Sequence, residues 1–151
     1  MSHPPSHTEQ TDVAAIDWYA VLGKRVKTYL PGYMGFEVDD IQPGTMALKV
    51  TLRPHHLAPN GYLHAGTVLT LADTTCGFGC LANLPAGATN FTTLELKSNF
   101  LRTATEGTIR AVGTLVHGGR TTQVWDATVF DPQQRPMALF RCTQMILYSK
   151  E

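Results

Sequence analysis

The stretch AGTVLTLADTTCGFGCLANL, residues 65–84, decides the fold. Apolar and small residues fill nearly all of it, it is too long for a strand, and the turn formers Pro59-Asn60-Gly61 and Pro85-Ala86-Gly87 bound it. The pattern predicts a helix that is apolar nearly all round. Because such a helix needs other elements around it, we expect it at the centre of the domain.

The segments on either side predict what surrounds this helix. A lead-in helix is expected between Asp12, as its cap, and Pro31-Gly32, as its stop, with Val13, Ile16, Ala20, Val26 and Leu30 at helical spacing. Alternation around the turn at 42–45 predicts a β-hairpin, and four β-rich runs follow at 91–101, 107–117, 121–130 and 137–149. Short connections imply antiparallel neighbours. The predicted fold class is α+β, with an antiparallel sheet wrapped around the central helix and an N-terminal helix.

Composition limits the function classes. A length of 151 residues fits one domain, expected over residues 11–151 after a flexible tail at 1–10. Lysine and arginine total 12, as do aspartate and glutamate, which argues against a nucleic-acid or anionic-membrane partner. Neither a signal peptide nor 18 uninterrupted apolar residues occurs, so we expect a soluble cytoplasmic protein. The spacing of Cys76, Cys80 and Cys142 matches no zinc or redox motif and predicts buried free thiols and no metal.

Asp73 is the only formally charged residue between Arg53 and Glu95, with histidines counted as neutral. At 100° per residue, Asp73 shares about one third of the helix circumference with small apolar side chains. Burial of a carboxylate is costly without hydrogen bonds or water, and it raises the pKa toward the range useful in acid–base chemistry. Two interpretations stay open: a structural acid bonded to a threonine, a backbone amide or solvent, and a functional acid.

His64 stands nine residues before Asp73, directly before the predicted helix start. The amides of a helix's first turn lack intrahelical acceptors and can hold an oxyanion. Alone, His64 is compatible with an ordinary capping or loop histidine. Together, a histidine, free amides and a lone acid supply a carbonyl polariser and a base or nucleophile.

The stretch HHLAPNGYLHAGTVLTLADTTCGFGC, residues 55–80, resembles the signature of the hotdog-fold acyl-CoA thioesterases of the phenylacetic-acid-degradation (PaaI-like) family. That signature has a turn, Gly-x-x-His-Gly-Gly, and then Leu-x-Asp near the middle of the helix. Gly61, His64, Gly66, Leu71 and Asp73 fall in register with it. The resemblance covers about residues 35–148, through TTLELKSNFLRTATEG and HGGRTTQVWDATVFD, and it implies a hotdog fold and thioester hydrolysis without a cofactor.

The resemblance also implies catalytic roles. Asp73 would act as general base or nucleophile toward the thioester carbonyl, the Ala65 amide would bind the oxyanion, and His64 would position the thioester. Two positions depart from the family pattern. Ala65 replaces the usual first glycine, and Ala58 stands where an asparagine or glutamine is frequent, so Asn60 is the candidate substitute.

Further substrate-binding residues follow from the same resemblance. Gly66 belongs to the helix start, and Thr93, with Thr92 next, is the candidate hydroxyl that assists the water, although a strand-filling threonine is the alternative. Gly119 and Arg120 are candidates for gripping coenzyme A phosphates, although the pair Gly118-Gly119 also suits a plain hairpin turn. Arg102 is a weaker candidate for the same task, and Trp125 and Tyr62 either line the acyl or pantetheine channel or belong to core or interface.

The sequence thus predicts an acyl-CoA thioesterase for an aromatic or medium-chain acyl group. The resemblance implies a homodimer whose sheets join edge to edge, or a tetramer of two such dimers, with Asp73 opposite the His64-Ala65 turn of its partner. Two alternatives stay open. One is a non-catalytic acyl-CoA-binding or sensor module, and the other is a hotdog dehydratase that acts on 3-hydroxyacyl thioesters.

Overall fold

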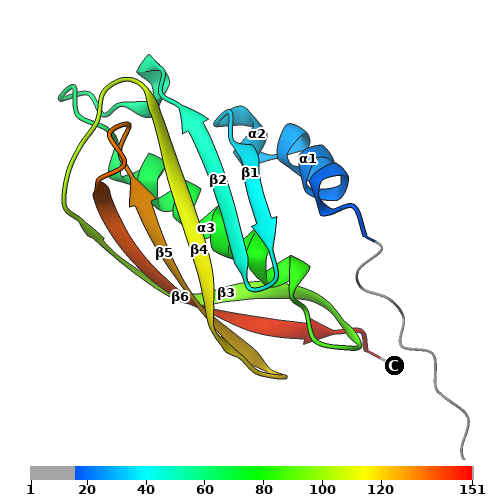
Figure 1. Ribbon diagram of the computed structural model, residues 1–151. Coiled ribbons are helices and arrows are strands. Elements are labelled where there is room, and N and C mark those ends of the chain that lie inside the picture. Colours follow the sequence, from blue (N-terminus) through cyan, green and yellow to red (C-terminus); the bar gives the residue numbers. More distant parts are fainter. Residues whose placement is uncertain (1–15, 151) are drawn as a thin grey trace, which may run out of the picture.

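The computed structural model describes residues 16–150 as a curved sheet that wraps one long helix, with two shorter helices beside one edge of the sheet (Figure 1). In chain order the elements are α1 (Trp18–Thr28), α2 (Leu30–Tyr33), β1 (Glu37–Gln42), β2 (Thr45–Thr51), the short 3-10 helix η2 (Pro54–His56), α3 (Ala65–Ala82), β3 (Ala88–Phe100), β4 (Thr108–Gly118), β5 (Thr122–Phe130) and β6 (Pro136–Tyr148). The predicted tail at residues 1–10 and the predicted Asp12 cap lie outside the described residues.

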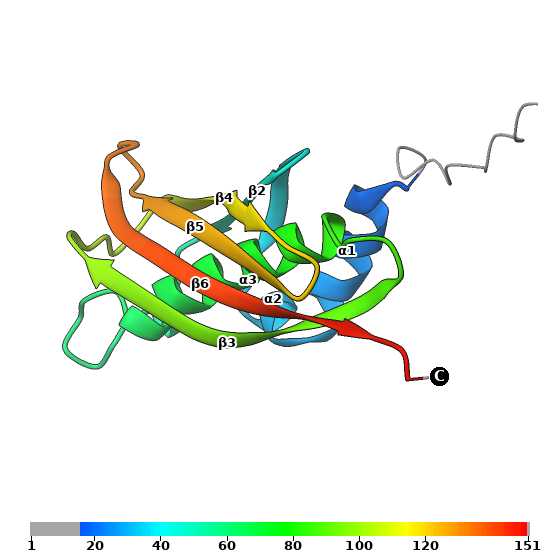
Figure 2. The same ribbon diagram turned by 90° about the horizontal axis from the view of Figure 1, so that it is seen from below.

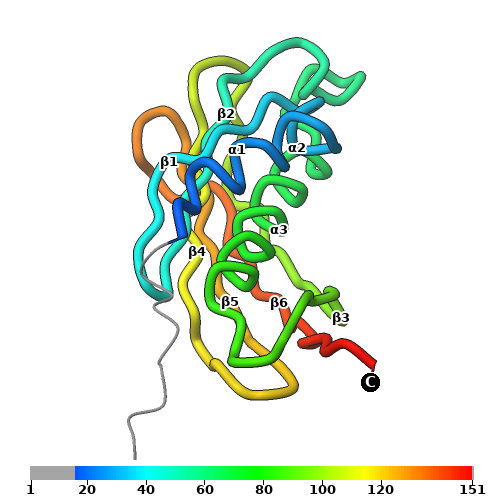
Figure 3. Tube along the Cα trace, turned by 90° about the vertical axis from the view of Figure 1, so that its right-hand side faces the viewer, coloured from blue at the N-terminus to red at the C-terminus, as the bar shows by residue number. Residues whose placement is uncertain are grey.

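The six strands form one sheet in the order β1-β2-β4-β5-β6-β3, and every neighbouring pair is antiparallel. β3 pairs with β6 on one side only, so β1 and β3 are the two edges. Figure 2 shows α3 along the concave side of the sheet, and Figure 3 shows α1 and α2 grouped near β1 and α3. The predicted antiparallel sheet around a central helix, with an N-terminal helix, is confirmed.

The N-terminal helix differs in detail from the prediction. Asp17 is the N-cap of α1, and its Oδ1 accepts a hydrogen bond from the Ala20 N–H at 3.1 Å. Pro31 does not follow a single long helix but lies in the first turn of α2, where the missing N–H costs nothing. Because the chain breaks between the two helices, the buried side chains are Leu22 and Val26, whereas Ile16 and Leu30 are exposed.

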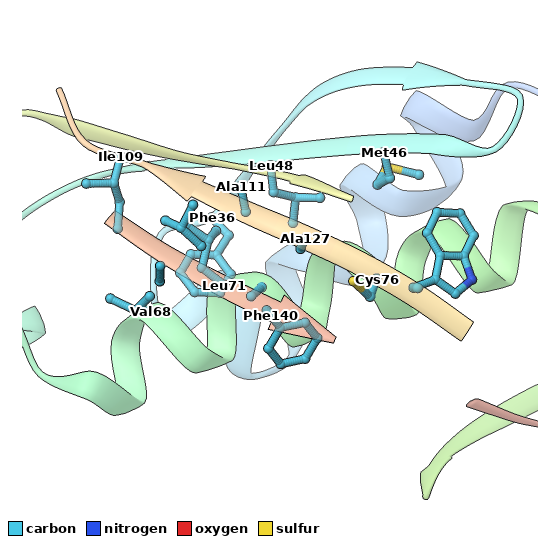
Figure 4. Close-up of a cluster of buried hydrophobic side chains, with 14 of the residues drawn as sticks. Phe36, Met46, Leu48, Val68, Leu71, Cys76, Ile109, Ala111, Ala127 and Phe140 are labelled. Atoms are coloured by element: carbon cyan, nitrogen blue, oxygen red, sulfur yellow. The ribbon is translucent and has the colours of Figure 1, made fainter. Parts of the chain in front are cut away.

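One core fills the space between α3 and the concave face of the sheet (Figure 4). The two sides contribute Val68, Leu71 and Cys76 from α3 and Met46, Leu48, Ile109, Ala111, Ala127 and Phe140 from the strands. All three cysteines are buried and free, as predicted. α3 ends at Ala82, two residues before the predicted end, because the Asn83 side chain donates to the Gly79 carbonyl at 2.8 Å and accepts from the Gly44 N–H at 3.1 Å.

Glycines on α3 let the sheet come close to the helix. A Cβ atom at Gly79 would lie 2.6 Å from Cζ3 of Trp125, and one at Gly77 would lie 3.0 Å from Cζ of Phe91. The Trp125 ring is wholly buried, and its Nε1–H donates to Gln123 Oε1 at 2.8 Å. Trp125 is therefore a core residue, and the structure does not support the alternative prediction that it lines a substrate channel.

Gly79→Ala is expected to destabilise the fold by about 1–3 kcal/mol, because the buried Trp125 ring has no room to move away from the added methyl group. Urea denaturation followed by circular dichroism measures this. The matched control is Gly23→Ala in α1, where a Cβ meets no atom within 4 Å and the change should stabilise by up to about 1 kcal/mol. Equal stability of the two variants would contradict this account of the packing.

Candidate active site

Asp73 lies near the middle of α3 and faces β3 from a partly buried position. The Thr93 hydroxyl on β3 is 3.4 Å from Asp73 Oδ1 and 2.9 Å from Gln144 Oε1. Thr93 pairs across the sheet with Gln144, and Gln144 pairs with Gln123, so the three residues form one row. Thr93 is therefore the predicted hydroxyl that the structure brings to Asp73, whereas Thr92 is exposed.

Burial sets the electrostatics of Asp73. It raises the pKa of the Asp73 carboxyl above its ordinary value, and the hydrogen bond from Thr93 offsets part of the rise. None of the ion pairs found within residues 16–150 includes Asp73. With no cation to hold it ionised, this carboxyl group takes up a proton more readily than an exposed one does.

His64 caps the N-terminus of α3. Its Nδ1 accepts from the Gly66 N–H at 2.8 Å, so in the neutral ring Nε2 carries the proton and can donate it to a ligand. Ala65 is the first residue of α3, and its N–H has no acceptor among the described residues. Because both residues are exposed, the helix start presents two adjacent donors to solvent.

The buried His56 holds the loop that leads into α3. Its Nε2 donates to the Met34 carbonyl at 2.8 Å, and its own carbonyl accepts from the His64 N–H at 3.1 Å and from the Thr67 hydroxyl at 2.8 Å. Burial lowers the pKa of His56, which keeps the ring neutral. Sequence reasoning missed this residue, since nothing local separates it from the exposed histidine before it.

The acid and the amide donor lie at different levels of α3. Eight residues separate Ala65 from Asp73, and at a rise of 1.5 Å per residue this places the two about 12 Å apart along the helix. A single thioester carbon cannot lie within about 3 Å of both groups. One chain therefore presents two half-sites: Asp73 with Thr93, and the Ala65 amide with His64.

Asn60 lies in the exposed loop before α3. Its Oδ1 accepts from the Tyr62 N–H at 3.2 Å, and the Ala58 N–H donates to the Tyr62 carbonyl at 2.7 Å. The carbonyl oxygen of the Asn60 side chain thus closes a turn, and its amide nitrogen makes no hydrogen bond to another described residue. Asn60 and Tyr62 are both exposed and lie in the loop that leads directly into His64 and the start of α3.

Gly119 and Arg120 form the tip of the β4–β5 hairpin. The Gly119 N–H donates to the Thr122 carbonyl at 2.9 Å, which closes the turn, and the Arg120 side chain is exposed. Gln123 on β5 is level with Thr93 and two strands away, roughly 10 Å across the sheet, and the hairpin tip lies beyond Gln123 along the strand direction. Arg102 donates instead to the carbonyl of residue 136 at 2.8 Å, which ties two chain segments together.

A cavity of about 540 Å³ lies between α1, α2, α3 and β3, and its lining includes neither Asp73 nor Thr93. Phe91, which lines the cavity, precedes Thr93 by two residues on β3 and packs against Gly77, one turn after Asp73. The other lining residues are Arg25, Tyr29, Pro31, Phe78, Leu81 and Asn90. Sequence reasoning did not find this cavity, because α1, α2, α3 and β3 form it jointly.

Comparison with known proteins identifies the family. The sequence pattern described as the Thioesterase superfamily matches residues 60–138. The chain belongs to this superfamily. The predicted resemblance to PaaI-like proteins and the prediction of a thioester hydrolase are confirmed at this level.

Individual relatives of this thioesterase-superfamily chain agree. It is 30% identical over 112 residues to the 1,4-dihydroxy-2-naphthoyl-CoA hydrolase of Listeria monocytogenes, covering 73% of this chain and 89% of the relative. It is 28% identical over 109 residues to the acyl-coenzyme A thioesterase PaaI of Escherichia coli, covering 72% and 75%. The crystal structure of thioesterase HI1161 from Haemophilus influenzae superposes with a TM-score of 0.82 at 22% identity, covering 88% and 92%. The fold is the hotdog fold.

Within residues 16–150, no helix is long and apolar enough to cross a membrane. The same part of the chain contains no cluster of three or more histidine, cysteine, aspartate or glutamate side chains arranged to hold a metal ion.

Asp73→Asn is expected to stabilise the protein at pH 7, by a gain on the order of 1 kcal/mol. Because the pKa of Asp73 is higher in the folded than in the unfolded state, the folded state binds its proton more tightly, and ionisation opposes folding. The free energy of unfolding of the wild type, relative to the variant, should fall as pH rises through the carboxyl range to 7.

Asp126→Asn is the control for this measurement. The hydrogen bond from Arg141 lowers the pKa of Asp126, so this variant should lose stability at pH 7 and match the wild type in acid. Urea denaturation between pH 4 and 8 measures both variants. If both shift in the same direction, the electrostatic account of Asp73 is wrong.

Proposed function

We propose that this chain hydrolyses an acyl-CoA thioester to a free acid and coenzyme A. The observation that carries the proposal is the pairing of Asp73 with the Thr93 hydroxyl in a member of the thioesterase superfamily. Phe91, two residues before Thr93 on β3, lines a cavity that could receive the substrate. Two of its relatives are named as a 1,4-dihydroxy-2-naphthoyl-CoA hydrolase and an acyl-coenzyme A thioesterase. We assign the protein to the cytoplasm, where its three buried thiols stay reduced.

The acyl group is an aromatic or medium-chain one and occupies the cavity that Phe91 lines. The volume of about 540 Å³ falls within the range of small-molecule sites, and the walls from Phe78, Leu81 and Phe91 are apolar. A carbonyl placed at Asp73 directs the acyl substituent toward these walls. Arg25, Tyr29 and Asn90 carry the polar groups of the lining and would meet a polar substituent on the acyl group.

The reaction uses Asp73 as a general base. The carboxylate takes a proton from a water molecule that Thr93 orients, while the water oxygen bonds to the thioester carbon and the carbonyl becomes an oxyanion. The oxyanion accepts from the Ala65 N–H, and His64 Nε2–H holds the substrate in place. The C–S bond then breaks, and the proton on Asp73 passes to the leaving sulfur. In the alternative, Asp73 itself attacks and forms an anhydride that water opens.

A second copy of the chain completes each site. The separation of the two half-sites along α3 supports this, because Asp73 of one protomer can then work with the His64-Ala65 turn of another. β3 supports this arrangement, because it is a 13-residue edge strand that exposes Leu94, Leu96 and Phe100. Natural proteins rarely leave such an edge uncovered. Pairing of two β3 edges gives a homodimer with two sites, and pairing of dimers gives a tetramer.

The coenzyme A part of the substrate lies along the surface. Arg120 supplies an exposed guanidinium group for its phosphates, with the Gly119 region of the hairpin beside it. Asn60 and the Gly66 end of the helix flank the pantetheine arm.

Purified protein should release free thiol from aryl-acyl or medium-chain acyl-CoA, measured with a thiol reagent across a panel of chain lengths. Asp73→Asn should lower kcat by about 10²–10⁴-fold, because the base is lost, while calorimetry should show that substrate binding is retained.

Binding without thiol release by the wild type would instead show a sensor module. Formation of an enoyl thioester would show a dehydratase. Incorporation of ¹⁸O into Asp73 during a single turnover in ¹⁸O-water would show that Asp73 acts as the nucleophile and not as the general base.

Ala65→Pro should lower kcat by about 10²–10³-fold with little change in stability. Proline suits the first helical position and the extended backbone of His64 (φ −67°, ψ 130°), yet it lacks the N–H that would bind the oxyanion. Ala65→Ser, which keeps the N–H, is the control.

Mixing Ala65→Pro with Asp73→Asn tests the shared site. If the half-sites come from different protomers, subunit exchange between these two inactive variants should restore about one quarter of the wild-type activity. A stable, active monomer in size analysis at micromolar concentration, or no recovery after proven exchange, would contradict the shared site.

A further inference from the structure

We propose that Gln144 is a positioning residue for Asp73. Its side-chain amide can either accept a hydrogen bond from Thr93 or donate one to it, and Thr93 in turn contacts Asp73. The carboxyl group can therefore gain and lose a proton while every buried polar group keeps a hydrogen-bond partner. The inference rests on the proposed function of Asp73 as general base. Gln144 itself does not touch the substrate and acts through Thr93.

Gln144 is wholly buried on β6, between Thr93 on β3 and Gln123 on β5. Its Oε1 lies 2.9 Å from the Thr93 hydroxyl, and its Nε2 lies 3.3 Å from Cys142 Sγ. The same hydroxyl lies 3.4 Å from Asp73 Oδ1. Thr93 therefore connects Gln144 to the carboxyl group.

The Thr93 hydroxyl has one proton and two oxygen neighbours, so it can donate to only one of them. When Asp73 is protonated, its O–H donates to Thr93, and Thr93 donates to Gln144 Oε1. When Asp73 is ionised it only accepts, and Thr93 must donate to it. Gln144 then satisfies Thr93 with its Nε2–H, after its amide has turned over, and its Oε1 accepts the Cys142 S–H.

An amide side chain serves both arrangements, since it carries a donor and an acceptor at equivalent positions. Gln123, the next residue in the row, shows the contrast. Its Nε2 donates to the Asn83 carbonyl at 2.7 Å, and its Oε1 accepts from Trp125 at 2.8 Å, so both ends are fixed by partners that do not titrate. Gln144 differs from Gln123 because its hydrogen-bond partner Thr93 also contacts Asp73, a group that titrates.

The other titratable groups close enough to Asp73 to feel its charge are the thiols of Cys76 on α3 and Cys142 on β6. The hydrogen bond with Cys142, together with burial, raises the pKa of Cys76, so this thiol stays protonated. On β3 and β5 the neighbours in the row, Thr93 and Gln123, do not titrate. The hydrogen bond with Cys76 and a weaker one from Gln144 lower the pKa of Cys142, against the effect of burial. The Gln144 side chain thus lies between two titratable groups, Asp73 through Thr93 on one side and the Cys142 thiol on the other.

Gln144→Met tests the inference, because methionine fills the same space without a donor or acceptor. The Thr93 O–H then loses Gln144 Oε1 as an acceptor and donates to the Asp73 carboxyl group, and this hydrogen bond is stronger with the ionised form than with the protonated form. We expect the acid-side pKa of kcat/KM to fall by about one unit and kcat to fall about tenfold, with KM unchanged. The same lowering should appear when the ¹³C signal of the Asp73 carboxyl is titrated by NMR without substrate.

Gln123→Met is the matched control, since Gln123 is an equally buried glutamine in the same row. It should lose stability but keep the Asp73 titration of the wild type. In a Thr93→Val background, Gln144→Met should produce no further change in the titration, because the link to Asp73 is already broken.

Two results would overturn the inference: an unchanged Asp73 titration in Gln144→Met, or equal shifts in Gln144→Met and Gln123→Met. The NMR titration needs no substrate, so it separates this inference from the proposed function. Lowering of the Asp73 pKa in a protein that releases no thiol would uphold the hydrogen-bond chain and refute the thioesterase. Thiol release with an unshifted titration would do the reverse.

Discussion

A helix can lie inside a curled sheet only if the two backbones come close, and small residues allow this here. Gly77 and Gly79 present no side chain where Phe91 and Trp125 pack, and a Cβ at Gly113 on β4 would come within 3.3 Å of a threonine methyl group on α3. This contact surrounds α3 with the sheet and brings β3 against the helix. The position of the Thr93 hydroxyl beside Asp73 is therefore set by core packing and not by a loop, which gives the half-site the rigidity of the core.

The second half-site depends on a different support. The His64-Ala65 turn is held by hydrogen bonds that converge on the backbone of the buried His56, outside the sheet. The acid is thus built on the helix–sheet core, and the amide donor is built on an anchored loop at the helix start. In the proposed dimer, each protomer contributes one of these parts to its partner's site. The relative orientation of the two protomers therefore sets the distance between Asp73 and the Ala65 amide.

Residues that depend on local pattern could be predicted from the sequence, and those that depend on assembly could not. The apolar run of α3, its bounding turns and the isolated Asp73 follow from spacing, whereas the choice of Thr93 over Thr92 came from the family resemblance. Gln144 carried a readable signal, since it occupies an inward position in the alternation of β6, where an apolar residue is the rule. The cavity had no such signal, because Arg25 reaches it only through the packing of α1 against elements far along the chain.

The donor proposed for the oxyanion is a main-chain N–H at the first position of a helix, and that has a consequence for how this protein can vary. Nearly any amino acid at residue 65 supplies the same N–H, so the side chain there is released from the chemistry. In the proposed site, exchange of glycine for alanine at this position would change the space beside the thioester and leave the donor in place. In that site, the side chain of residue 65 affects the substrate range and the main-chain N–H serves the chemistry. The substrate range can therefore change by substitution at this residue while the oxyanion donor is kept.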